Sequence, residues 1–119
     1  MNMDTKITSI IAEEILDSRG RPTLKATVRV GEYAGTFSVP SGASTGSHEA
    51  KELRDADGGV QSAIENIEKI IAPELIGVDA TDQQWIDDRL RALDGTADKS
   101  RLGGNAMIGV SIACAKARR

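Results

Sequence analysis

The stretch LKATVRVGEYAGTFSV at residues 24–39 decides the fold of this chain. Apolar and polar residues alternate from Leu24 to Val30, as they do on a strand with one buried face. Gly31-Glu32 has the composition of a tight turn, and residues 33–39 read as the returning strand. The stretch therefore predicts an antiparallel hairpin.

A third strand is predicted upstream, over residues 6–16, where β-branched residues are enriched. Strict alternation would place one set of side chains on one face and the intervening set on the other: Ile7, Ser9, Ile11 and Glu13 against Thr8, Ile10, Ala12 and Glu14. The breaker cluster at residues 17–22 joins this strand to the hairpin. Three consecutive strands with short links predict an antiparallel β-meander.

The sequence pattern after Pro40 predicts mainly helices. Residues 48–54 suggest one or two helical turns, and the apolar spacing over residues 60–71 predicts an amphipathic helix that Pro73 stops. The pattern Thr81-Asp82-Gln83-Gln84 indicates a capping box in front of a further helix. Asp94-Gly95 has the composition of that helix's end.

The last predicted helix, over residues 106–117, is apolar nearly all round and therefore requires burial on every side. The sequence also stops at Arg119 without a Gly or Pro terminator, so we expect the front part of a larger protein, or a subunit that packs on one. The expected fold class is α+β, a three-stranded antiparallel β-meander followed by a helical part, in one domain over residues 1–119.

Composition excludes several classes of protein. With 119 residues the chain is too short for a (β/α)₈ barrel of roughly 250. A formal charge of −3 argues against nucleic acid or anionic lipid as a partner, and the longest apolar stretches fall well short of the ~20 residues of a membrane span. One cysteine and one histidine exclude a disulfide framework and a Cys/His zinc site, so we expect a cytoplasmic protein. Aromatic residues make up 3%, which predicts an aliphatic core.

The segment Ser41–Ser47 is the most suggestive chemically. Its glycines can turn backbone N–H groups toward an anion, and its hydroxyls are hard donors for Mg²⁺; the alternative is a mobile, solvated connection. It lacks the lysine of a Walker A loop. His48 beside Glu49 could form a general base and its orienter, although a local hydrogen bond is the simpler interpretation.

Three other features favour structural roles. The sequence Asp55-Ala56-Asp57-Gly58 lacks the later oxygen ligands of a calcium loop. Cys114 reads as a small core residue, not as a reactive thiol. Trp85 reads as a packing residue, since no second aromatic accompanies it.

Several sequence blocks follow one another along essentially the whole chain. The first are DSRGRPT at residues 17–23 and VPSGASTGSHEA at residues 39–50, followed by ELRD at 52–55, IAP at 71–73, LDGTADKS at 93–100 and LGGNAMIGVS at 102–111. Together these blocks resemble the N-terminal domain of the enolase (phosphopyruvate hydratase) family. The resemblance implies a three-stranded meander and a helical part that cap a C-terminal barrel. It implies a lyase of glycolysis, which converts 2-phosphoglycerate to phosphoenolpyruvate with Mg²⁺.

The resemblance also assigns roles along the chain. Ser44 matches the serine that binds the second Mg²⁺, and Gly42, Ala43 and Thr45 match the flanking residues of a closing loop over the substrate. The family's proton-abstracting lysine and its metal-binding carboxylates belong to the barrel, so we expect this chain alone to be inactive.

The chain departs from the family pattern at three places, one of which is its stop at Arg119, where the family's last helix runs on toward the barrel. Gly58-Gly59 shortens a connection that usually carries several more residues. Glu13 stands where many enolases have an arginine that pairs across a subunit interface, which puts the family's dimer contact in doubt, although we still expect a homo-oligomer. The alternative functions are a non-catalytic interaction module that packs on a partner chain and, with less support, a small phosphate or nucleotide binder that uses residues 41–47.

Overall fold

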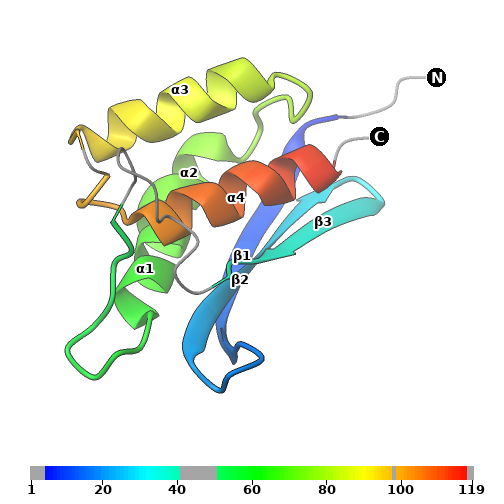
Figure 1. Cartoon of the computed structure of the whole chain (residues 1–119). Helices are drawn as coiled ribbons and strands as arrows, with labels where there is room; N and C mark the ends of the chain where they lie inside the picture. Colours follow the sequence, from blue (N-terminus) through cyan, green and yellow to red (C-terminus); the bar gives the residue numbers. More distant parts are fainter. Residues whose placement is uncertain (1–4, 41–50, 98, 118–119) are drawn as a thin grey trace.

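A three-stranded antiparallel sheet forms the first half of the fold (Figure 1). The computed structural model describes residues 5–40, 51–97 and 99–117. Strand β1 (Ile7–Leu16) pairs with β2 (Pro22–Val30), and β2 pairs with β3 (Tyr33–Ser38), in the order β1-β2-β3. The predicted meander is confirmed, and so is the α+β class, because the rest of the described chain is helical.

The faces predicted for β1 are wrong at its beginning. Ile7 pairs with Val30, whereas Ser9 pairs with Arg29, so Thr8 is an extra residue in the ladder. This bulge reverses the side-chain alternation, because two residues of β1 stand opposite one step of β2. Ile7 and Ile10 are consequently both buried, which strict alternation forbids.

One helical run covers residues 61–75 in three pieces, α1 (Gln61–Asn66), the π-helix η1 (Ile67–Ile71) and α2 (Ala72–Leu75). Pro73 does not stop the helix, contrary to the prediction. The amide of Ala72 donates to the carbonyl of Ile67, five residues back, and this wide turn restarts the helix at α2. Proline is tolerated there because an N–H in the first turn of a helix has no intrahelical acceptor.

Two further helices are α3 (Gln83–Asp94) and α4 (Gly104–Ala117). The predicted capping box is wrong, because the N-cap is Asp82, whose carboxylate accepts the Trp85 amide. Gly95 ends α3 in the left-handed conformation, as predicted. The helical turns expected at residues 48–54 are absent from residues 51–54, the part of that range that the structure describes.

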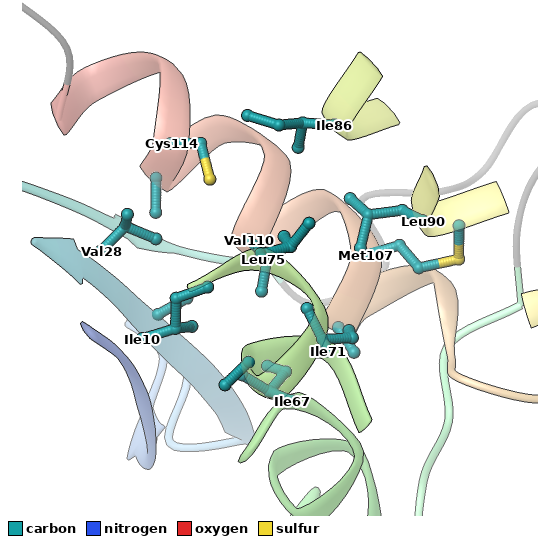
Figure 2. Packing of buried hydrophobic residues seen from close by; sticks show 14 of the residues in the cluster. Ile10, Val28, Ile67, Ile71, Leu75, Ile86, Leu90, Met107, Val110 and Cys114 are labelled. Atoms are coloured by element: carbon teal, nitrogen blue, oxygen red, sulfur yellow. The ribbon is translucent and has the colours of Figure 1, made fainter. Parts of the chain in front are cut away.

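The helices cover one face of the sheet, and α4 lies across β2 and β3 (Figure 1). Aliphatic side chains from the sheet and from all helical pieces fill the space between these layers (Figure 2). The expected aliphatic core is confirmed, because Phe37 only borders the buried cluster and none of the described aromatic residues belongs to it. None of the helices among the described residues has the length and apolarity needed to cross a bilayer.

The apolar circumference of α4 is explained within the chain itself. One side of the helix lies on β2 and β3, and other sides contact α3, α1 and η1. Ile108, 40% exposed, is its one large apolar residue that is exposed in the described structure. The apolar circumference of α4 therefore does not by itself require a partner outside the described residues.

Candidate functional site

The flanks of residues 41–50 are the part of the candidate site that the structure describes. Gly42, Ala43, Ser44 and Thr45, and the pair His48-Glu49, lie outside the described residues. The two described ends, Val39-Pro40 and residues 51–54, fix where this segment leaves the fold and where it returns.

The entering flank is held at Val39, directly after β3. Its amide donates to the carbonyl of Leu24 (2.9 Å), and its carbonyl accepts the buried hydroxyl of Thr23 (2.5 Å). The side chain of Val39 is buried against α4, where a methyl group on Gly109 would stand 3.2 Å from Val39 Cγ2. The sheet and α4 together set the position of this end.

The returning flank is held by the first turn of α4. The amide of Gly104 donates to the carbonyl of Lys51 (2.7 Å). The side-chain amide of Asn105 then brackets Leu53, since Oδ1 accepts the Leu53 N–H (3.0 Å) and Nδ2 donates to the Leu53 carbonyl (3.2 Å). Asn105 is 3% exposed, so this is a buried polar contact made by a residue 52 positions away.

Arg54 extends the fixed region to the β1–β2 turn. Its guanidinium forms an ion pair with Glu52 (2.9 Å) and donates from Nη1 to the carbonyls of Pro22 and Gly58, both at 2.8 Å. Arginine suits this position because its planar fork carries several donors at fixed angles. Two of the family-like blocks, at residues 17–23 and 52–55, are thereby joined in space.

The acidic residues that follow serve as caps. The Asp55 carboxylate accepts the Gln61 and Ser62 amides at the start of α1, and Asp57 accepts the Gly59 amide. The hydrogen bond from the Ser62 side chain, with smaller contributions from these two amides, lowers the pKa of Asp55. The connection at Gly58-Gly59 is thus closed by local hydrogen bonds.

The described residues hold no group of three or more His, Cys, Asp or Glu side chains that could bind a metal ion. Burial, with a smaller contribution from the charge of Asp87, raises the pKa of Cys114 to about 12, so the thiol stays protonated and is not a nucleophile. Trp85 is 43% exposed, so the packing role expected for it is only partial.

Reasoning from the residues alone did not find the three that fix the flanks, Thr23, Arg54 and Asn105. Each makes a long-range hydrogen bond: Thr23 to Val39 over 16 positions, Arg54 to Pro22 over 32, and Asn105 with Leu53 over 52. The one available signal was Gly103-Gly104 immediately before Asn105, since paired glycines often mark a close backbone approach.

Comparison with known proteins identifies the family. The family model described as "Enolase, N-terminal domain" matches residues 7–118. Enolase of Thermococcus kodakarensis is 56% identical over 117 residues, and enolase of Thermococcus gammatolerans is 55% identical over the same length. Each match covers 94% of this chain but 27% of the relative, so the chain spans about a quarter of these proteins. The chain belongs to the enolase family, in which it corresponds to the N-terminal domain.

Proposed function

We propose that this chain works as the N-terminal domain of an enolase, a Mg²⁺-dependent lyase that converts 2-phosphoglycerate to phosphoenolpyruvate in glycolysis. The observation that carries the proposal is the family match over residues 7–118, together with relatives named enolase at 55–56% identity. The domain then packs on a C-terminal barrel that corresponds to the uncovered part of those relatives.

The chemistry divides between the two parts. Removal of a proton next to a carboxylate needs a base and positive charge to stabilise the resulting dianion. In this proposal the barrel supplies the lysine base and most metal ligands, and bound Mg²⁺ supplies the positive charge. This domain contributes residues that orient the substrate and exclude water. The isolated 119-residue chain is therefore inactive.

Within the domain, we assign a metal-ligand role to Ser44 and substrate-facing roles to Gly42, Ala43 and Thr45. The support is the resemblance of this segment to the family, and the firm attachment of both its flanks supports a role that requires position. Hydroxyl oxygen is a ligand type that Mg²⁺ accepts.

We also propose that the protein forms a homo-oligomer. Glu13 pairs across the sheet with Lys25 at 3.9 Å inside the same chain. An oligomer of this protein would therefore use contacts other than the arginine that many enolases carry at position 13.

A chimaera tests the function. This chain replaces the matched segment of the Thermococcus kodakarensis enolase, and formation of phosphoenolpyruvate is followed by its absorbance with Mg²⁺ and 2-phosphoglycerate. We expect turnover by the chimaera and none by the 119-residue chain. Turnover by the chain alone would refute the division of labour, and a folded but inactive chimaera would favour the non-catalytic interaction module instead.

Substitutions in the chimaera test the site. Ser44→Ala removes the proposed ligand, and kcat/KM should fall at least about tenfold, with a higher Mg²⁺ concentration needed for half-maximal rate. Ser47→Ala is the matched control, because it removes the same hydroxyl from the same segment. Equal activity of the two variants would rule out the role of Ser44.

A further inference from the structure

We propose that Asn105 is a positioning residue for the enolase reaction, because its side chain sets the point at which the chain returns from residues 41–50. This inference rests on the proposed function. It concerns a residue that contacts neither substrate nor metal in the proposal and acts through the backbone of Leu53.

The contact imitates a β-ladder. The bonds from Gly104 to Lys51 and between Asn105 and Leu53 fall on alternate residues of the returning flank, the spacing that a neighbouring strand would use. One planar amide supplies both the acceptor and the donor that Leu53 needs. Aspartate at this position could accept but not donate, and alanine could do neither.

The residue directly before α4 leaves room for this contact. Gly103 has φ +99, and a Cβ on it would stand 2.6 Å from Cβ of Leu53. A side chain at position 103 would therefore push Leu53 away and separate it from Asn105. The close approach of Gly103 and the bonds from Asn105 to Leu53 therefore depend on each other, because a Cβ at position 103 would also stand 2.8 Å from Asn105 Oδ1.

Both flanks of the segment rest on one helix. Val39 lies against Gly109, and Leu53 is bracketed from Asn105, so the two attachment points are about 6 Å apart along the axis of α4. If the returning flank moves away from Asn105, the entering flank stays in place on Gly109. The separation between the two flanks then changes. Because a misplacement of about 1 Å can cost up to ~100-fold in rate, loosening Leu53 should lower catalysis without unfolding the domain.

Trypsin provides a test on the 119-residue chain itself, since Lys51 and Arg54 are cleavage sites on either side of Leu53. Asn105→Ala should raise cleavage at these sites about tenfold relative to cleavage at Arg91 in α3, and Asn105→Asp should give an intermediate ratio. Ile71→Val and Ile71→Ala, in the core, provide controls of graded stability and should leave the ratio unchanged. An unchanged ratio in Asn105→Ala would overturn the proposal.

The chimaera separates this inference from the proposed function. There, Asn105→Ala should lower kcat/KM about tenfold at a temperature where the protein is fully folded, and Asn105→Asp should lie between it and the parent. The Ile71 variants should stay within about twofold. An inactive parent chimaera would count against the proposed function, whereas an active parent with an equally active Asn105→Ala variant would count against the positioning role alone.

Discussion

A single methyl group added to Gly35 should displace α4 from the sheet. An ideal Cβ at this position of β3 would stand 2.1 Å from the Ala113 carbonyl oxygen and 2.3 Å from the Ala117 nitrogen. Both atoms belong to helix backbone, so no rotamer change relieves the clash. Ordinary contact requires the helix to move away by about 1.3 Å, which loosens the buried face of α4 against β2 and β3.

The expected cost is large, because helix and sheet are both rigid. Overpacking of a core typically costs about 1–3 kcal/mol, and a clash between two backbones belongs at or above the top of that range. Gly109→Ala on α4 is the matched comparison. Its Cβ would meet the flexible end of Leu24 at 3.0 Å and Val39 at 3.2 Å, which can yield slightly. Alanine also favours a helix over glycine by about 1 kcal/mol, so the net change should lie within about 1 kcal/mol of zero.

Urea unfolding followed by far-UV circular dichroism measures both variants against the parent chain. Gly35→Ala should lose at least about 2 kcal/mol more free energy of unfolding than Gly109→Ala. Gly20→Ala controls for the glycine itself, because Gly20 is at φ +78 with open space around it, so only backbone strain of about 1 kcal/mol is expected. Equal stability of the Gly35 and Gly109 variants would refute the close packing of α4 on β3.

Three further predictions concern single polar groups. Burial alone would raise the pKa of Asp94, but hydrogen bonds, chiefly from the Leu102 amide (2.7 Å), outweigh it and lower the pKa. Asp94→Asn should therefore lower the free energy of unfolding by about 2–3 kcal/mol at neutral pH. This difference, measured by urea unfolding, should shrink as the pH falls below 3.8. The raised pKa of Cys114 predicts that a disulfide reagent at pH 8 labels the thiol only as fast as the chain unfolds, so rapid labelling of folded protein would contradict its burial. Asp82→Ala should lower the free energy of unfolding by about 1 kcal/mol, because it removes the N-cap of α3. A larger loss of stability in Thr81→Ala would instead show that Thr81 is the N-cap, as in the predicted capping box.

Local patterns were sufficient for the sheet but not for its details. The hairpin follows from alternation between Leu24 and Val30 around a two-residue turn, and both signals are local. The bulge at Thr8 is not local, because it depends on which residue of β2 stands opposite and on the bridge between Lys6 and Asp79. The hydroxyl of Thr8 donates to the carbonyl of Arg29 (3.1 Å), a contact that the alternation of apolar and polar residues does not predict.

The predicted helix boundaries were wrong where neighbouring residues could each begin or end the helix. Thr81 and Asp82 are both good N-caps, and the choice was decided by Asp79, whose carboxylate accepts both the amide and the hydroxyl of Thr81. Pro73 is a helix breaker by rule, yet a wide turn before it provides a new helix start. Both deciding contacts span only two to five residues, so the information was local, but the pattern did not say which of the competing geometries would form.

The candidate site was the part of the molecule that could be predicted least well from the sequence. Its residues 42–45 came from the resemblance to a family, since composition alone favoured a solvated connection. The flanking contacts of Asn105 could not be inferred, because an asparagine in an apolar helix has no local signature of a bracket 52 residues away. Long-range hydrogen bonds of this kind depend on the packing of α4 and become visible only with it.

Helix α4 links core packing to the position of the candidate site. The same helix contacts β3 at Gly35, the entering flank at Gly109 and the returning flank at Asn105. Lifting α4 by a change at Gly35 would move both flanks together, whereas a change at Asn105 would release the returning flank alone. Because small residues on α4 permit these close approaches, they constrain the site as strictly as they constrain the core. A substitution far from residues 41–50 can therefore shift both described flanks by tilting this one helix.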